Sequence, residues 1–185
     1  MIDARVFREG QEMTDLPVDT LSDVRAEADT LVWVDVTDGS DEEITRIGEE
    51  FTVHPLAVED LRQRHQRPKV DDYDRHLLLV VYGSEAAVEG RPMALHELAV
   101  VSGENFLLTF HGVPPIDAET VAKRIRAHPE LAHQGAGFLL YVLLGELIDS
   151  FDPAMELVGE RVEELERRSS PARRSRATSW PCGGI

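Results

Sequence analysis

The sequence predicts an α/β domain followed by a long C-terminal helix, and two patterns carry this prediction. Strand-like and helix-like segments alternate between residues 31 and 127, which is typical of a layered α/β domain. Beyond residue 137 the strand patterns stop, and apolar residues recur at helical spacing as far as residue 165. With 185 residues, 42% of them hydrophobic and 29% charged, the chain has the composition of one globular domain with additional helix.

The charge of the chain limits the partners it can bind. A formal net charge of −16 repels nucleic-acid phosphates and anionic lipid headgroups, and it attracts cations. The single cysteine, Cys182, can form neither an internal disulfide nor a cysteine metal cluster. The N-terminus has no signal-peptide pattern, and the most apolar stretch, residues 138–148, contains Glu146 and is shorter than the about 20 residues of a membrane helix. We therefore expect a soluble chain in a reducing compartment that does not bind nucleic acid.

The first strand and helix are predicted by local signals. Residues 31–37 are β-branched and aromatic and precede an Asp-Gly turn, which predicts a strand. Ser40 and Glu43 have the spacing of a capping box, and apolar residues then follow at helical intervals, so we expect a helix over residues 41–51. Pro55 suits the first turn of a second, short helix.

Three further strands and a helix complete the predicted domain. Residues 77–82 are continuously apolar, as in a strand that is buried on both faces. Residues 96–101 and 105–110 read as two strands of a hairpin. A helix is expected over residues 116–127. The order of the strands in the sheet cannot be deduced from these patterns.

An apolar seam runs along the C-terminal helix at alternating intervals of four and three residues. Its members are Leu144, Ile148, Phe151, Met155, Val158, Val162 and Leu165. From the seam alone we favour an amphipathic helix packed on its own domain; the alternative is a projecting stalk that packs against copies of itself. Pro153 is expected to bend or interrupt the helix.

The composition changes after Glu166. Residues 169–185 contain several arginines and no acidic residue, and we expect this tail to be disordered. A native flexible tail and a change of reading frame both account for it. We favour a change of reading frame, because a well-formed heptad helix ends in unrelated composition.

Several motifs in a fixed order resemble those of the CorA family of metal-ion transporters. Residues 53–61 read VHPLAVEDL and residues 65–73 read HQRPKVDDY, which is similar to the family's HPL-x-x-ED and RPK-[VI]-[ED]-x-[YF] signature. Residues 32–36 (VWVDV) resemble its tryptophan-bearing strand, and residues 138–149 resemble the start of its long stalk helix. The resemblance spans roughly residues 30 to 168.

The resemblance implies a layered α/β/α cytoplasmic domain over residues 1–134, the start of a stalk helix over residues 135–168 and an unrelated tail. Family members are pentamers with two membrane helices per subunit and a Gly-Met-Asn motif at the pore. This sequence contains neither a membrane-helix pattern nor Gly-Met-Asn. The implied function is the divalent-cation-sensing part of a magnesium or cobalt transporter, on the cytoplasmic face of the membrane. A chain cut before the membrane helices would not transport ions by itself, and it is not expected to be an enzyme.

The resemblance also implies cation-binding residues. The family places a regulatory divalent-cation site between subunits at the position of Asp60, with Glu59 beside it; Mg²⁺ is the expected ion and Co²⁺ an alternative. Such a hydrated ion needs only one or two carboxylates, but the partner carboxylate lies beyond the matching part of the chain. At a second family site Gly145 replaces an aspartate, and Glu146 and Asp149 are the nearest carboxylates that could substitute for it.

Simpler roles exist for the acidic residues of the first motif. Glu59 and Asp60 can be solvated charges or partners of Arg62 and Arg64. A free-standing acidic interaction module is another possible function of the whole chain.

A metal-dependent hydrolase is a further alternative, and its ligands would come from the two motifs. The candidate ligands are Asp60, His65, Asp71 and Asp72.

The basic run and the tryptophan of the motifs also have structural interpretations. The run at residues 67–69 fits a turn, with its charges balanced by Asp71, Asp72 and Asp74, better than a phosphate site. Trp33 is expected to be a core residue.

Overall fold

The computed structural model describes residues 1–8, 11–14, 16–27, 29–85, 93–128 and 134–169. Strands and helices follow one another in short groups along this length. The elements are β1 (Ile2–Arg8), β2 (Gln11–Thr14), η1 (Val18–Thr20), α1 (Leu21–Arg25), β3 (Thr30–Thr37), α2 (Asp41–Glu50), α3 (Pro55–Arg62), β4 (Lys69–Asp72), β5 (Leu77–Ser84), β6 (Leu95–Ser102), β7 (Phe106–His111), α4 (Ala118–Ala127), α6 (Ala136–Asp149) and α7 (Asp152–Ser169).

A seven-stranded mixed sheet forms the centre of the domain, in the order β2-β1-β3-β7-β6-β5-β4. The pair β3 and β7 is parallel, with Trp33 opposite Leu107, and the other neighbouring strands are antiparallel. The short strand β4 forms one edge of the sheet. It carries the RPK motif's lysine, so the motif lies at the border of the domain.

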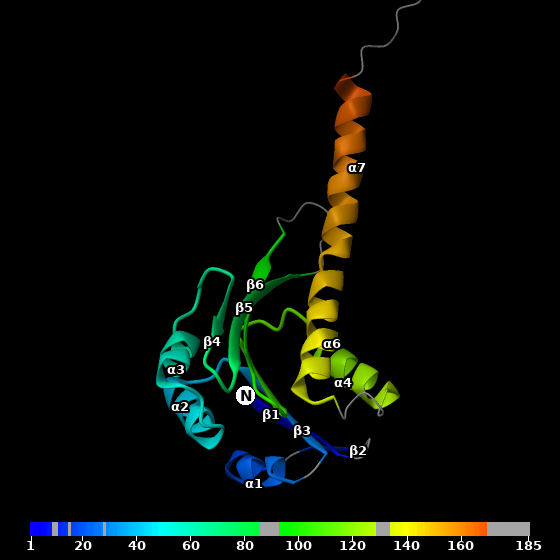
Figure 1. Ribbon diagram of the computed structural model, residues 1–185. Coiled ribbons are helices and arrows are strands. Elements are labelled where there is room, and N and C mark those ends of the chain that lie inside the picture. Colours follow the sequence, from blue (N-terminus) through cyan, green and yellow to red (C-terminus); the bar gives the residue numbers. More distant parts are fainter. Residues whose placement is uncertain (9–10, 15, 28, 86–92, 129–133, 170–185) are drawn as a thin grey trace, which may run out of the picture.

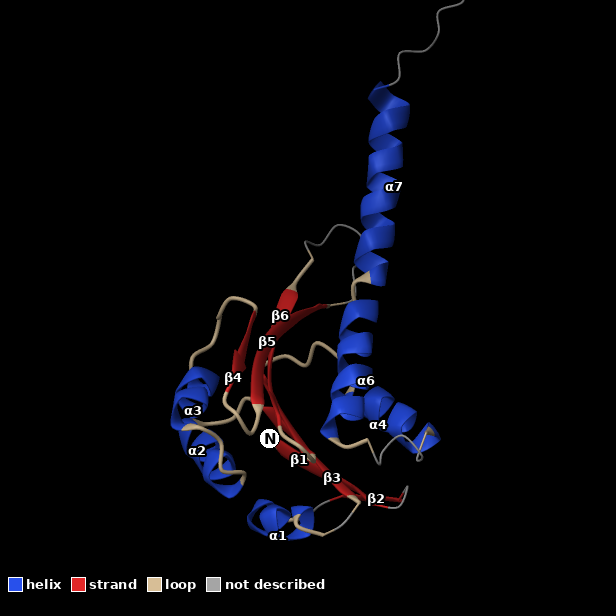
Figure 2. Cartoon of the chain, viewed as in Figure 1, coloured by secondary structure: helices blue, strands red, loops and turns tan. Residues whose placement is uncertain are grey.

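Helices cover both faces of the sheet, which confirms the predicted α/β/α layers. In Figure 2, α1, α2 and α3 lie against one face and α4 and α6 against the other. The first interface buries alternate strand residues such as Val34 against Ile47 and Phe51. The second buries Trp33 against residues such as Leu139, so Trp33 is the core residue that the sequence predicts.

Local signals in the sequence account for several element boundaries. Ser40 and Glu43 form the complete capping box at the start of α2, which satisfies two amide groups of the first turn. Pro55 is in the first turn of α3, as predicted. In the hairpin between β6 and β7, a Cβ on Gly103 would lie 2.1 Å from the Phe106 ring, so this turn requires glycine.

Five elements were not predicted from the sequence. Strands β1 and β2 and the short helices η1 and α1 form in the first 29 residues, and β4 forms in the charged segment after the RPK motif. Strand β1 lies inside the sheet between β2 and β3, with Ala4 and Val6 buried. The N-terminal segment is therefore part of the core.

The C-terminal helix projects from the domain, and the interpretation that it packs on its own domain is wrong. Figure 1 shows α7 extending away from the layers, in line with α6. Apart from the half-buried Phe151, the seam is exposed from Ile148 onward, with Met155 at 65% and Leu165 at 62% exposed. Among the described residues of α7, only Ala154 is buried.

The helix is interrupted where Pro153 predicts it. Helix α6 ends at Asp149, and α7 begins at Asp152, so Pro153 lies in the first turn of the second helix, where a proline is tolerated. No described helix is long and apolar enough to cross a bilayer. The predictions for the tail concern residues 170–185, which lie outside the described residues.

Candidate functional site

Helix α3 presents the first motif at the edge of the domain. Its start is capped by His54, whose Nδ1 accepts a hydrogen bond of 3.2 Å from the backbone N–H of Leu56. Ala57 and Leu61 are buried against the core, which fixes the orientation of the helix. Glu59 is exposed and Asp60 is half-buried, so both carboxylates are on the outer side of the helix.

The carboxylate of Asp60 is bound by a lysine of the second motif. The ammonium of Lys69 donates a hydrogen bond of 2.6 Å to Oδ2 of Asp60 and lies 2.9 Å from Oδ2 of Asp71. Because Asp60 accepts this hydrogen bond, the pKa of Lys69 is raised above its ordinary value, and Asp71 contributes in the same direction. The two motifs thus meet in a cluster of two carboxylates around one positive charge.

The alternative partners proposed for Asp60 are wrong. Nη2 of Arg62 donates a hydrogen bond of 2.5 Å to the Thr45 hydroxyl, and Nη1 of Arg64 pairs with Asp38 at 2.9 Å. Both arginines are close to Asp60 in sequence, but Arg62, at the end of α3, contacts α2, and Arg64, beyond that end, contacts the segment after β3. The partner is Lys69, nine residues away, which the sequence did not reveal.

The run at residues 67–69 forms part of a folded connection, as its structural interpretation expects. Of the three aspartates expected to balance its charges, Asp71 pairs with Lys69. Asp72 instead accepts a hydrogen bond of 3.0 Å from the backbone N–H of Asp74. Among the described interactions, neither Asp72 nor Asp74 contacts residues 67–69. The chain bends at Pro68 and enters β4 at Lys69, and the charge partners of Lys69 are Asp60 and Asp71.

An aromatic stack joins the two motifs behind this cluster. The ring of Tyr73 lies 4.8 Å from that of His54 and 5.5 Å from that of His76, both in stacked orientation. Nε2 of His76 accepts a hydrogen bond of 3.3 Å from the backbone N–H of His54. Burial first, and the charge of His54 second, lower the pKa of His76. These contacts hold the start of α3 against the end of β4.

Three polar residues hold the connection between α3 and β4. The side-chain Nε2 of Gln66 donates a hydrogen bond of 2.6 Å to the backbone carbonyl of Asp60, and its backbone N–H donates one of 2.8 Å to Glu97. The hydroxyl of Tyr82 donates to the backbone carbonyl of Gln66 at 2.5 Å and lies 2.9 Å from Glu97. Sequence reasoning missed all three, because their contacts join segments far apart in the chain.

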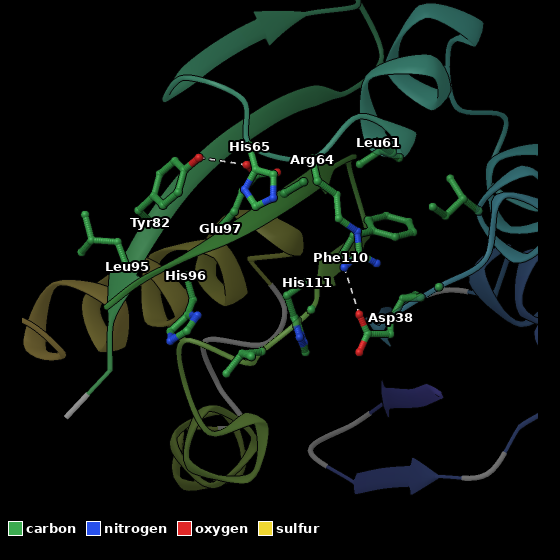
Figure 3. A pocket seen from close by; sticks show the side chains of 16 residues that line it. Asp38, Leu61, Arg64, His65, Tyr82, Leu95, His96, Glu97, Phe110 and His111 are labelled. Atoms are coloured by element: carbon green, nitrogen blue, oxygen red, sulfur yellow. Dashed lines mark hydrogen bonds and ion pairs between the residues drawn. The ribbon is translucent and has the colours of Figure 1, made fainter. Parts of the chain in front are cut away.

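A cleft of about 340 Å³ opens beside this connection, at the end of the sheet where β6 and β7 separate. Figure 3 shows Asp38 and Arg64 joined by an ion pair in its lining. Its polar lining consists of Asp38, Arg64, His65, Tyr82, His96, Glu97 and His111. Arg64 and Tyr82 already have partners, and His111 lies 3.0 Å from Asp35, so most of these polar groups are engaged within the chain.

The second pair of predicted metal ligands also has a basic partner. Oε1 of Glu146 lies 2.5 Å from Nε of Arg124 in α4, although the angle does not favour a hydrogen bond. Oδ2 of Asp149 lies 3.6 Å from Nη2 of the same arginine. A Cβ added at Gly145 would meet no other segment within 4 Å. The pair therefore ties α6 to α4 in this structure.

The described part of the chain contains no group of three His, Cys, Asp or Glu side chains able to hold a metal ion. The residues of the hydrolase alternative do not assemble either: Asp60 and Asp71 share Lys69, whereas Asp72 bonds to Asp74 and His65 lines the cleft. A fully coordinated site within one copy thus does not fit these residues. A hydrated ion held by one or two carboxylates requires only Glu59 and Asp60.

Comparisons with known proteins agree with the motifs. The model of the CorA-like Mg²⁺ transporter protein family matches residues 28–178. YfjQ of Bacillus subtilis is 31% identical over 134 residues, which cover 72% of this chain and 41% of the relative. The cobalt/magnesium transport protein CorA of Thermotoga maritima is 25% identical over 142 residues, 76% of this chain and 40% of the relative. The chain thus spans about two fifths of the length of these relatives.

Solved structures share the fold at lower sequence identity. The full-length CmaX protein superposes with a TM-score of 0.73 at 15% identity, covering 94% of this chain and 53% of CmaX. The soluble domain of CorA from Methanocaldococcus jannaschii superposes with a TM-score of 0.60 at 19% identity, covering 91% of this chain and 64% of that domain. These similarities support the layered domain and its long C-terminal helix.

Proposed function

The chain belongs to the CorA-like Mg²⁺ transporter family, and from this premise we propose that it is the cytoplasmic, cation-responsive part of a magnesium or cobalt transporter. The family description and the relatives are those of transporters, which confirms the prediction that the chain is not an enzyme. The location at the cytoplasmic face of a membrane, the response to cations and the assembly into oligomers are parts of the proposal.

The exposed seam of α7 is the observation that carries the proposal. Val158 and Val162 are 57% and 48% exposed along a helix that projects from the domain. A regular apolar stripe at heptad spacing is stabilised when it packs against an equivalent helix, and a continuous apolar surface in water marks an interaction site. We propose that the stripe packs against copies of the same chain, as pentamers in the family do.

Charge gives divalent cations a role in such an assembly. Each copy carries a net charge of −16, so neighbouring copies repel one another. We propose that Mg²⁺, or Co²⁺ in its place, binds Asp60 and Glu59 at the boundary with a neighbouring copy and reduces this repulsion. Glu146 and Asp149 are a second, weaker candidate pair. The cation can favour assembly only to the extent that it binds the assembled chains more tightly than the separate chains.

Sedimentation velocity of the full chain tests the proposed assembly. We expect oligomers whose fraction rises with protein concentration, and a marked loss of association in the Val158→Asp variant, because the charge lies in the seam. Arg167→Gln is the matched control: it changes the net charge by the same amount as Val158→Asp at an exposed residue of α7, but outside the seam. A chain that remains monomeric at every protein concentration, with and without MgCl₂, contradicts assembly and favours a free-standing module.

A further inference from the structure

We propose that the ammonium of Lys69 competes with divalent cations for the carboxylates of Asp60 and Asp71, and thereby lowers the affinity of this surface for them. The inference rests on the proposed function, which assigns cation binding to Asp60. To that function the inference adds a residue that opposes cation binding: the ammonium of Lys69 occupies the position that the divalent cation would take.

The geometry of the cluster resembles that of a bound cation. The Nζ atom of Lys69 lies 2.6 Å from Oδ2 of Asp60 and 2.9 Å from Oδ2 of Asp71. The two carboxylates come from different elements, α3 and β4, and converge on one point. A divalent cation placed between them would need the position that the ammonium already fills.

The backbone on both sides of the cluster is held by the fold, whereas the lysine ammonium is held by its two ion pairs. Lys69 lies opposite Val80 in the antiparallel pairing of β4 and β5, and α3 is anchored through the buried residues Ala57 and Leu61. The lysine ends in a flexible four-carbon chain, and about 29% of that side chain is exposed. Lys69 can therefore leave the carboxylates without a change of fold.

Binding of a divalent ion at Asp60 therefore involves an exchange. With Lys69 in place the three side chains carry a net charge of −1, and without it the two carboxylates carry −2. A tethered cation has a high effective concentration at its site, and its hydrogen bonds to carboxylates are of the stronger, charge-assisted kind. Mg²⁺ must therefore displace the ammonium of Lys69 or bind a site whose negative charge is partly neutralised. As a result, Lys69 raises the Mg²⁺ concentration that is needed for binding at this surface.

Isothermal titration of the full chain with MgCl₂ tests the competition. In Lys69→Gln we expect Mg²⁺ binding about tenfold tighter than in wild type, because one nearby positive charge is removed. Arg8→Gln is the matched control: it removes one positive charge from the Arg8–Glu27 ion pair, on β1 near the opposite edge of the sheet. If Lys69→Gln binds Mg²⁺ no more tightly than Arg8→Gln, the competition is refuted.

A double variant separates this inference from the proposed function. Asp60→Asn, introduced into Lys69→Gln, is expected to return the affinity to that of wild type or below. If Asp60→Asn has no effect in either background, the assignment of cation binding to Asp60 is wrong. If Asp60→Asn weakens binding in wild type but Lys69→Gln does not tighten it, only the role of Lys69 is wrong.

A measurement on the wild-type chain covers the case that Lys69→Gln does not fold. The sequence contains two lysines, Lys69 and Lys123, so NMR of isotopically labelled lysine gives one signal for the cluster and one for the exposed side chain in α4. Addition of MgCl₂ at neutral pH is expected to move the signal of Lys69 toward that of an exposed lysine and to leave that of Lys123 unchanged. An unchanged signal of Lys69 at saturating Mg²⁺ contradicts displacement.

Discussion

The backbone N–H of Ser84, at the end of β5, donates a hydrogen bond of 3.0 Å to the Oγ atom of Ser150, directly after α6. The same hydroxyl donates one of 2.6 Å to the backbone carbonyl of Leu147. At the neighbouring Gly83, a Cβ would lie 2.8 Å from the Leu147 side chain, so strand and helix are in close contact. This junction fixes the point at which the helix leaves the domain.

Substitution of Ser150 is expected to weaken this junction. In Ser150→Ala the buried N–H of Ser84 loses its acceptor, which costs about 1–3 kcal/mol when a buried donor is left unsatisfied. Urea unfolding followed by circular dichroism measures the change. Ser169→Ala is the control, because Ser169 also bonds a helix carbonyl but is exposed at the end of α7; an equal loss in both variants would contradict the role of the junction.

A buried polar chain in the sheet leads to a second prediction. The indole N–H of Trp33 donates a hydrogen bond of 3.0 Å to the Thr109 hydroxyl, which itself bonds to Asp35. Thr109→Val preserves the shape but leaves the indole N–H without this acceptor, so we expect a loss of about 1–3 kcal/mol in the free energy of unfolding. The comparison variant is Thr37→Val, at a half-buried position of β3. An equally large loss of stability in Thr37→Val would show that the hydrogen bond between Trp33 and Thr109 is not the cause.

Two glycines with different surroundings give a third prediction. Gly103→Ala places a Cβ 2.1 Å from the ring of Phe106, and we expect a destabilisation of about 1–3 kcal/mol from overpacking. Gly145→Ala has open space at the new Cβ and gains helix propensity of up to about 1 kcal/mol. Thermal unfolding of both variants should show melting temperatures that shift in opposite directions; similar shifts would exclude the steric explanation.

Histidine 76 makes the stability of the fold depend on pH. Burial lowers the pKa of His76 below its ordinary value of 6.5, and its Nε2 acts as the acceptor for the backbone N–H of His54. The unfolded chain therefore binds a proton more readily than the folded one. The contribution of His76 to stability is complete above pH 6.5 and is lost as the pH falls below that value.

Unfolding experiments at several pH values test this assignment. His76→Gln keeps a hydrogen-bond acceptor but does not titrate, so its free energy of unfolding should fall less than that of wild type between about pH 7 and about pH 5. His65→Gln changes an exposed histidine and should leave the wild-type dependence intact. If His76→Gln loses as much stability on acidification as wild type, another group is responsible.

The sequence predicted those elements whose signals are local. The capping box of Ser40, the proline at the start of α3 and the apolar run of β5 each act within one element. Strand β1 was missed, although Ala4 and Val6 are buried in it, because its charged residues hide the alternation. The order of the strands depends on pairings between distant segments, which no local pattern contains.

The candidate site was only partly predictable for the same reason. The motif identified Asp60 and the turn that brings Lys69 back toward it, but the contact between the two was not foreseen. Arg62 and Arg64 were the nearest bases in sequence, yet they contact Thr45 and Asp38 instead. Proximity in sequence therefore misidentified the charge partner of Asp60.

The most direct test of the proposed function is the effect of Mg²⁺ on self-association in wild type and in Asp60→Asn, measured by sedimentation velocity of the full chain at constant ionic strength. The proposal predicts that MgCl₂ increases the oligomeric fraction of wild type and has a much smaller effect on the variant. An equal response of the two chains to MgCl₂, or the absence of any response in wild type, would contradict a cation-responsive surface at Asp60.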